Sequence, residues 1–361
     1  MGAELTVRLG ALAANYGGVK RRASSALAFP VVKANAYGLG VDHVAPRLAS
    51  AGADTFFVAR IEEGVALRAL LPNVRIFVLD GFSEATAPAF LSHRLQPVLN
   101  SPEEIAQCSD LAKRERRKLE AAVQIDTGMN RSGLSYSELA QIEPQLKRAF
   151  AGIELKLVMS HLACADEPSH PMNKAQLERF RAALARLPSA PASLAASAGI
   201  ELGRDYHFDA VRPGMALYGG KPIPARANPY STVAILTSRV LQLRRVDKGE
   251  TVGYGATFAA ARPTILATVA MGYADGLMRA NAGKGKALLG GVRVGFAGRI
   301  SMDLAALDVT DVPEAALVVG AQAEFLGDAI TLDEVAESAG TITHEVLTSI
   351  SPRARRRYTE S

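Results

Sequence analysis

Short apolar runs alternate with amphipathic stretches along the first part of the chain. The apolar runs predict buried strands at residues 29–32, 55–59, 74–79, 95–99, 120–125, 155–160, 192–195 and 209–211. Apolar residues at helical spacing between these runs predict helices at residues 44–49, 61–70, 83–91, 101–113, 137–150 and 172–187. The segment Ser101-Pro102-Glu103-Glu104 indicates a helix start, because serine caps a helix and proline suits its first position.

About eight strand–helix alternations predict a parallel sheet closed into a TIM-like (β/α)8 barrel of the α/β class. An open doubly wound sheet is the competing prediction. The proline-rich segment 221–229 indicates a linker, and beyond it the pattern is mostly strand-like, with helices expected only at 332–339 and 344–350. We therefore expect a barrel over residues 1–222 and a C-terminal, mostly-β domain over residues 223–361.

Polar side chains of reactive types follow the predicted strands. They are Lys33, Asn100, the segment 126–131, His161, Ser197 and the segment 212–214. Each type has ordinary structural uses on its own, such as capping a helix. Together they fall on the rim formed by the carboxyl ends of the strands, where barrels carry their chemistry. The sequence therefore predicts one active site at this rim.

Lys33 directly follows the apolar run Phe29-Pro30-Val31-Val32. Burying an ammonium group is costly unless it is paired or neutralised. A lysine at such a position is either an ordinary solvent-exposed residue or a desolvated amine, which loses its proton readily and forms Schiff bases. The glycines at 38 and 40 allow a sharp turn just after it.

The composition limits the class of protein and the cellular compartment that we expect. Hydrophobic residues make up 48% and charged residues 21%, as in globular proteins, and the net charge of +5 is too diffuse to predict nucleic-acid binding. Two isolated cysteines predict neither a disulfide framework nor a metal site. We find no secretory signal and no apolar stretch of transmembrane length, so we expect a cytoplasmic protein that binds no membrane.

Several motifs, in order along the chain, resemble those of alanine racemases, which are fold-type III pyridoxal-phosphate enzymes. They are Val32-Lys33-Ala34-Asn35-Ala36-Tyr37-Gly38-Leu39-Gly40, Asp126-Thr127-Gly128-Met129-Asn130-Arg131-Ser132-Gly133, His161, Arg212-Pro213-Gly214-Met215-Ala216-Leu217-Tyr218-Gly219, Gly253-Tyr254-Gly255-Ala256-Thr257, Gly272-Tyr273-Ala274-Asp275-Gly276, Gly298-Arg299-Ile300-Ser301-Met302-Asp303 and Arg356-Arg357-Tyr358. The resemblance extends over nearly the whole chain and both expected domains.

The resemblance implies that Lys33 carries pyridoxal 5'-phosphate as a Schiff base and acts as a base on one face of the substrate's α-carbon. Tyr254 resembles the opposite base, which in this family reaches into the site of the other subunit of a homodimer. Arg212 resembles the residue that faces the pyridine nitrogen, and His161 the residue packed against the ring. The cofactor phosphate would be held by Tyr37, Ser197, the backbone N–H groups of Gly214 and Met215, and Tyr358.

Substrate contacts are implied in the same way. Arg131 resembles the residue that contacts the cofactor's phenolic oxygen and the substrate carboxylate, and the backbone at Met302 resembles the other carboxylate contact. The residues that resemble the lining of the substrate access channel are Asp166, Tyr273, Arg279 and Arg299. The implied activity is racemisation of L- and D-alanine, an isomerase reaction that supplies D-alanine for cell-wall peptidoglycan.

Four positions depart from the family pattern. Gln124 stands where many members have a carbamylated lysine, Ser193 and Ala196 replace a common histidine and asparagine, and Ser301 replaces a common cysteine. None of these is an implied direct contact of cofactor or substrate. The departures at Gln124 and Ala196 keep open a racemase of broader scope, for example one that accepts serine, and a decarboxylase on the same fold is a further alternative. A non-catalytic pyridoxal-phosphate-binding protein is the alternative from another class, although such proteins lack a second domain.

Overall fold

Eight parallel strands surround the centre of the first domain. In the computed structural model, which describes residues 2–361, they are β2 (Leu27–Ala28), β3 (Thr55–Val58), β4 (Arg75–Val78), β5 (Gln96–Leu99), β6 (Leu119–Gln124), β7 (Ile153–Met159), β8 (Ala192–Ser193) and β9 (Ala210–Val211). β3 to β8 pair in consecutive order, and β2 pairs with β9. Single bridges from Val31 to Phe57 and from Ala196 to Arg212 join the two sets. The predicted (β/α)8 barrel is thereby confirmed.

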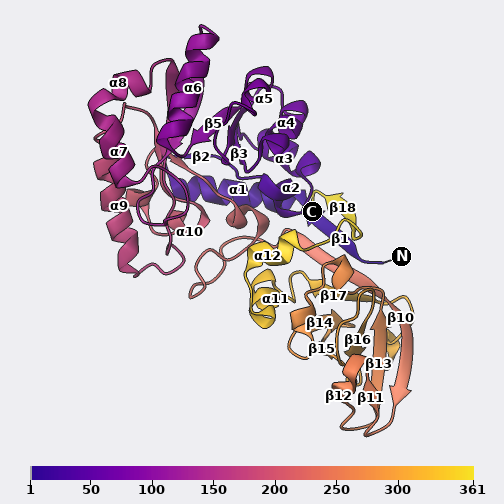
Figure 1. Cartoon of the computed structure of the whole chain (residues 1–361). Coiled ribbons are helices and arrows are strands. Elements are labelled where there is room, and N and C mark those ends of the chain that lie inside the picture. Colours follow the sequence, from indigo (N-terminus) through magenta and orange to yellow (C-terminus); the bar gives the residue numbers. More distant parts are fainter. Residues whose placement is uncertain (1) are drawn as a thin grey trace.

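Helices follow the strands around the outside of the barrel (Figure 1). They are α1 (Leu9–Ala23), α3 (Val41–Ser50), α4 (Ile61–Leu70), α5 (Ala87–Ser92), α6 (Pro102–Arg114), α7 (Tyr136–Ile142), α8 (Leu146–Ala149), α9 (Pro171–Leu184) and α10 (Ser197–Ile200). Ser101 caps α6 as predicted, since its hydroxyl accepts from Glu104 N at 3.2 Å. The helix predicted at 137–150 is wrong as one element, because the segment Glu143–Gln145, which contains Pro144, forms a 3-10 turn there.

The strand predicted at residues 29–32 is also wrong. The paired strand ends at Ala28, and only Val31 makes an isolated bridge. Proline has no N–H group with which to extend a ladder, and Pro30 contributes only its carbonyl, which accepts from Phe57 N at 2.9 Å. Lys33 therefore does not follow a regular strand but begins a short helical turn, α2 (Lys33–Tyr37).

The second domain is a mostly antiparallel sheet. Its strands are β1 (Glu4–Arg8), β10 (Ala234–Val246), β13 (Thr264–Val269), β14 (Lys286–Leu289), β15 (Val292–Phe296), β16 (Ala305–Asp308), β17 (Gln322–Leu326) and β18 (Arg355–Thr359), in the order β13-β16-β15-β14-β17-β10-β1-β18. β10 also pairs with β13, which closes part of the sheet on itself. A separate hairpin, β11 (Thr251–Val252) and β12 (Phe258–Ala259), flanks Tyr254. Two helices, α11 (Leu332–Ala339) and α12 (Thr343–Thr348), complete the domain.

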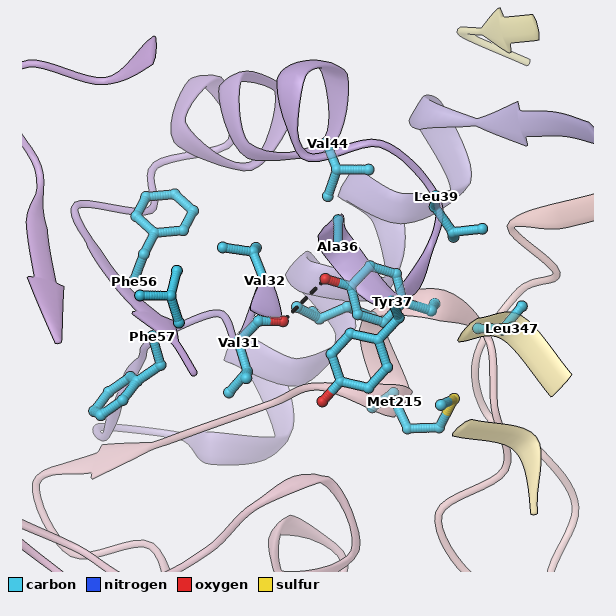
Figure 2. Close-up of a cluster of buried hydrophobic side chains, with 14 of the residues drawn as sticks. Val31, Val32, Ala36, Tyr37, Leu39, Val44, Phe56, Phe57, Met215 and Leu347 are labelled. Atoms are coloured by element: carbon cyan, nitrogen blue, oxygen red, sulfur yellow. Dashed lines mark hydrogen bonds between the residues drawn. The ribbon is translucent and has the colours of Figure 1, made fainter. Parts of the chain in front are cut away.

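Both chain ends lie at the junction between the domains (Figure 1). β1, which precedes the barrel in the sequence, runs antiparallel to β10 and parallel to β18. α12 packs against α2 so closely that a Cβ at Gly38 would lie 2.7 Å from Leu347 O. Figure 2 shows Val31, Ala36 and Tyr37 in one apolar cluster with Met215 and Leu347. The turn that begins at Lys33 is therefore held by residues of both domains.

No helix within residues 2–361 combines the length and the apolar character needed to cross a bilayer.

Candidate active site

The Lys33 turn has an unusual backbone. Ala34, Asn35, Ala36 and Tyr37 all have φ between 52° and 56°, so four consecutive non-glycine residues adopt the left-handed helical conformation. This conformation costs roughly 1–2 kcal/mol per residue, because Cβ approaches the following carbonyl oxygen. Gly38 and Gly40, at φ 84° and 99°, continue the positive-φ path, as expected from the sequence.

Hydrogen bonds from distant segments hold this turn in place. Glu63 on α4 accepts from Ala34 N at 2.6 Å. Arg356 on β18 donates to Gly38 O from Nε at 3.1 Å and from Nη2 at 2.8 Å. The Asn35 side chain accepts from Val41 N at 2.8 Å. The surrounding structure thus compensates a local strain that the segment could not sustain alone.

The Lys33 amine is prepared for covalent chemistry by its surroundings. Burial and the neighbouring Arg131 guanidinium lower the pKa of Lys33, while Glu63 and Asp80 act against this shift. A lysine whose ammonium form is disfavoured has a larger fraction of free amine at neutral pH. Of the two interpretations that its sequence position left open, the desolvated amine is the one that the structure supports.

Arg212 lies at the centre of the barrel rim and is 3% exposed. Its Nη1 donates to Ser193 O at 2.8 Å and to Ser193 Oγ at 2.5 Å, and its Nη2 donates to Ser160 O at 2.5 Å. Burial lowers the pKa of Arg212 to about 9, which leaves it protonated at neutral pH. Ser193 therefore supplies the partner of Arg212 in place of the histidine that is common in the family.

His161 lies close to three cationic side chains. Burial, followed by the charges of Arg212, Arg131 and Lys33, lowers the pKa of His161 to about 3. The imidazole is therefore neutral at physiological pH. A neutral ring beside converging cations is suited to contact an anionic, aromatic ligand face to face.

Arg131 follows a tightly turned loop after β6 and is exposed in the single chain. The Asp126 carboxylate accepts from the N–H groups of three successive residues, at positions 128, 129 and 130. Gln124 donates from Nε2 to Ser132 O at 2.9 Å and to Ser132 Oγ at 2.7 Å. Gln124 thus ties the residue next to Arg131 by neutral hydrogen bonds, where a carbamylated lysine would carry a negative charge.

The residues expected at a phosphate converge beside this cluster. Ser197 Oγ accepts from Gly214 N at 3.0 Å and from Ala216 N at 3.1 Å, which holds the hydroxyl against residues 214–216 and leaves its proton free to donate. A Cβ added at Gly214 would collide with the Tyr37 hydroxyl, which shows that this tyrosine lies directly against the cradle. Two hydroxyl donors at a tight backbone turn, close to a cationic cluster, fit a phosphate.

Tyr358 on β18 lies against the backbone turn that follows Tyr37. Its hydroxyl would collide with a Cβ at Gly40, and its ring stacks on His43 at a centroid separation of 3.6 Å. Together with an available amine at Lys33 and a protonated guanidinium at Arg212, this donor set matches the aldehyde, phosphate and ring nitrogen of pyridoxal phosphate. The residues present therefore fit the expected cofactor.

The remaining predicted residues lie elsewhere. Tyr254, Tyr273, Arg279, Arg299 and Met302 all belong to the C-terminal domain and are exposed. Figure 1 places β11 and β12, which flank Tyr254, at the end of that domain remote from α2. A single chain thus does not bring Tyr254 to Lys33. Asp166 is also exposed, in the loop between β7 and α9 of the barrel.

The exposed residues of the C-terminal domain form a connected surface. Tyr273 N donates to Ser301 O and Ala274 N to Met302 O, both at 3.0 Å. A Cβ at Gly255, next to Tyr254, would lie 3.1 Å from the Arg299 guanidinium. The loops that carry Tyr254, Tyr273, Arg299 and Met302 are therefore neighbours on one surface of this domain.

Two residues near the Lys33 turn had no role in the sequence prediction. Tyr218 donates to Val31 O at 2.9 Å, and its ring centroid lies 4.6 Å from that of Tyr37. His344 at the start of α12 lies 5.8 Å from Tyr37, measured between ring centroids, and burial lowers its pKa. Tyr218 lies in one of the quoted motifs, which was a usable signal, whereas nothing in the sequence brings His344 to the barrel.

Comparison with known proteins covers both domains. Residues 7–222 match the family model for the alanine racemase N-terminal domain, and residues 233–358 match that for the alanine racemase C-terminal domain. The catabolic alanine racemase of Agrobacterium fabrum is 48% identical over 355 residues, which cover 98% of this chain and 91% of the relative. The alanine racemase of Methylobacterium nodulans is 45% identical over 359 residues, which cover 99% and 96%.

A solved structure agrees in fold over the whole chain. The alanine racemase of Bartonella henselae, with covalently bound pyridoxal phosphate, superposes with a TM-score of 0.95 at 39% identity. The match covers 99% of this chain and 100% of that one. On sequence, on fold and on the donor set at the barrel rim, the chain belongs to the alanine racemase family.

Proposed function

We propose that this chain interconverts L- and D-alanine with pyridoxal phosphate, using Lys33 and Tyr254 as bases on opposite faces of the substrate. The observation that carries the proposal is the Lys33 turn, where an amine of lowered pKa lies within electrostatic reach of Arg131 on the rim that Arg212 and the Ser197 cradle also form. Membership of the family supplies the reaction, and the geometry supports an assignment of roles to residues.

Lys33 has two tasks in this assignment. Its amine binds the cofactor covalently, and once the substrate's amino group has replaced it, the released amine can accept or return a proton at the α-carbon. Bound pyridoxal phosphate withdraws electrons from the α-carbon, which makes the loss of that proton feasible. The lowered pKa of Lys33 favours the form that can accept a proton at neutral pH.

Arg212 orients the cofactor and limits the chemistry. Its hydrogen bonds to Ser193 and Ser160 fix the position of the guanidinium. The guanidinium can donate a hydrogen bond to the ring nitrogen while keeping its proton. A ring that stays unprotonated attracts electrons less strongly, so the α-carbon is reprotonated quickly. This arrangement favours racemisation over transamination. His161, held neutral, packs against the ring, and Tyr37, Ser197, Gly214, Met215 and Tyr358 bind the phosphate.

Racemisation needs a second base, because a proton that leaves one face must return to the other. Tyr254 is 72% exposed, and Met302 is 53% exposed on the same surface. Exposed apolar side chains that lie close together are typical of interaction surfaces. Because the barrel of the same chain is remote, we propose a homodimer in which this surface completes the partner's site.

The remaining assignments concern the substrate. Arg131 binds the carboxylate, and the backbone at Met302 provides a second contact. The exposed side chains Asp166, Tyr273, Arg279 and Arg299 line and narrow the access channel. A narrow channel selects a small amino acid, which agrees with alanine as the substrate.

We place the enzyme in the cytoplasm and its product, D-alanine, in the supply of cell-wall peptidoglycan. Two free cysteines, of which Cys108 is buried, agree with a reducing compartment. We also propose that the functional boundary lies near residue 222, with the barrel before it and the base-contributing domain after it.

The decisive experiment is an amino-acid panel. Purified enzyme with pyridoxal phosphate is incubated with L-alanine, L-serine and larger amino acids, and the enantiomers are separated and quantified. We expect equal amounts of L- and D-alanine at equilibrium and slow turnover of the others. Faster racemisation of serine would favour the broader racemase that the substitutions at Gln124 and Ala196 leave open, and release of CO₂ would identify a decarboxylase.

A further inference from the structure

A buried glutamine on α9 lies behind the loop that carries Arg131. Gln176 is 0% exposed. Its Nε2 donates to Thr127 Oγ1 at 3.1 Å and to His161 O at 2.9 Å, and its Oε1 accepts from Ala163 N at 2.8 Å. A carbonyl cannot donate and a backbone N–H cannot accept, so these two partners determine which end of the amide is which.

The hydrogen bonds continue from Gln176 to Arg212. Thr127 Oγ1 lies 2.8 Å from Ser160 Oγ, and Ser160 O accepts from Arg212 Nη2 at 2.5 Å. Because Gln176 donates to Thr127, the hydroxyl proton of Thr127 remains available to Ser160. Thr127, Ser160, Gln176 and Arg212 are each at most 3% exposed, so water does not substitute for these bonds. One buried path therefore joins Arg212, the backbone at His161 and the base of the Arg131 loop.

The loop itself transmits this constraint. The Asp126 carboxylate binds the N–H groups of residues 128 to 130, and Arg179, one turn further along α9, donates to Thr127 O at 3.0 Å. A loop tied internally in this way moves as a rigid unit. The hydrogen bonds of Thr127 to Gln176 and Arg179 therefore determine the orientation of the whole loop. A displacement of about 1 Å in a positioned catalytic group can cost about a hundredfold in rate.

We propose that Gln176 is a positioning residue for the racemase reaction. It fixes the position of Arg131 relative to His161 and Arg212, so that the substrate carboxylate is held at a defined position beside the cofactor ring. This inference rests on the proposed role of Arg131. It differs from simple core filling, because Gln176 acts through its hydrogen bonds to Thr127, which anchors the loop, and to the backbone of His161.

The chain contains a matched control for this proposal. Gln96 is also buried, at 8% exposure, and its amide likewise accepts from a backbone N–H, that of Ile76 at 3.1 Å. It donates to Arg94 O and to the Glu120 side chain. Gln96 begins β5 and so lies at the amino end of the barrel strands, opposite the catalytic rim. Loss of its hydrogen bonds removes stability without disturbing the Arg131 loop.

The test compares Gln176→Met with Gln96→Met in the full-length holoenzyme. We expect similar losses of thermal stability, because each change leaves buried polar partners unpaired. Only Gln176→Met should raise KM for alanine, by about tenfold and by more than it lowers kcat. Hydrogen–deuterium exchange of peptides spanning residues 124–134 should accelerate only in Gln176→Met. If KM is unchanged, or if Gln96→Met raises KM equally, the positioning role is wrong.

Two further variants keep the test decisive. Thr127→Val removes the hydroxyl at nearly constant volume, and it should raise KM and loop exchange even if Gln176→Met does not fold. An unchanged KM in Thr127→Val overturns the proposal. Arg131→Lys tests the proposed role of Arg131 separately from that of Gln176. If it leaves KM unchanged, the assignment of Arg131 to the carboxylate is wrong, whereas a raised KM there with none in Gln176→Met rejects the positioning role alone.

Discussion

The two domains present their candidate catalytic residues in opposite ways. In the barrel, Arg212 is 3% exposed and bonded to three oxygens within 2.8 Å, and the Lys33 turn is tied to both domains. In the C-terminal domain, Tyr254 and Met302 are 72% and 53% exposed. The barrel half of the proposed site is completed when a single chain folds, whereas the residues proposed for the other half are displayed on a surface.

The difference follows from what each group needs. A guanidinium or an amine that is removed from water must be paired, neutralised or hydrogen-bonded. The barrel residues are therefore surrounded by hydrogen-bond partners from the same chain. An exposed tyrosine needs no internal partner, and its surroundings can be supplied by a second subunit. Variants of the barrel residues should therefore disturb a site that the chain itself builds, whereas variants of the exposed residues should remove a group that acts in the site of a second subunit.

Lys33→Ala should have the largest effect, because it removes the amine around which the barrel half is arranged. We expect the absorption band of covalently bound cofactor to disappear and activity to fall by at least about a thousandfold. The folded protein should not be less stable at neutral pH, since the pKa of Lys33 is already lowered by burial. The exposed Lys284→Ala is the control, and an unaltered spectrum in Lys33→Ala would refute the assignment.

Tyr254→Phe should come next and should leave cofactor binding intact. We expect about a hundredfold loss of activity, in the range typical of a missing acid–base group. In deuterated water, exchange of the α-proton should be lost mainly from one enantiomer. Tyr136→Phe removes the hydroxyl of a tyrosine that is 54% exposed on the barrel, and it should change activity by less than about twofold. Equal loss from both enantiomers would contradict the two-base mechanism.

Mixing the two inactive variants tests whether the halves belong to different subunits. After subunit exchange, a dimer of Lys33→Ala with Tyr254→Phe has one intact site, so random pairing should restore roughly a quarter of wild-type activity. Exchange must first be verified, for example with differently tagged chains. Inactive mixtures after verified exchange would show that each chain builds its site alone.

His161→Asn should alter the pH dependence of the barrel half in the apoprotein. The pKa of His161 is lowered to about 3 from 6.5, so between these values the unfolded chain binds a proton that the folded chain does not. The wild type should therefore lose stability as pH falls below about 6.5, and His161→Asn should lose less. Thermal midpoints measured from pH 7.5 to 4 provide the check, and parallel curves would contradict the neutral imidazole.

Met302→Leu should have the smallest effect, although Met302 is a predicted substrate contact. Its proposed contact is made by the backbone, so a similar apolar side chain should change kcat/KM by less than about threefold. A tenfold loss, with cofactor binding unchanged, would show that the exposed side chain itself touches the substrate or the partner's barrel.

Local chemistry explains which elements could be predicted from the sequence. The helices at 61–70 and 332–339 have the predicted bounds, because their apolar residues recur at helical spacing. α1 was not predicted, since glycines and polar residues dilute its pattern. β18, in which three of the five residues are arginines, has no strand pattern and is held by pairing with β1.

The candidate site likewise contains residues that the sequence predicts and features that only the fold produces. The rim residues were predicted because a barrel places its strand ends together and the motifs mark them. The left-handed turn at residues 34–37 was not, because alanine and tyrosine disfavour positive φ and adopt it only where Glu63 and Arg356 hold the backbone. Gln176 was hidden for a similar reason. A glutamine within a helical pattern predicts exposure, and only the fold places it against Thr127.

The sequence by itself determined the barrel, the mostly-β second domain, the family and the candidate site residues, because periodicity and motif order are properties of the chain. Only the tertiary structure decided how Lys33 is presented, that Ser193 accepts hydrogen bonds from Arg212, and that Tyr254 lies remote from the barrel of its own chain. These depend on groups far apart in the sequence, whose burial, charge and hydrogen bonds exist only once the chain has folded.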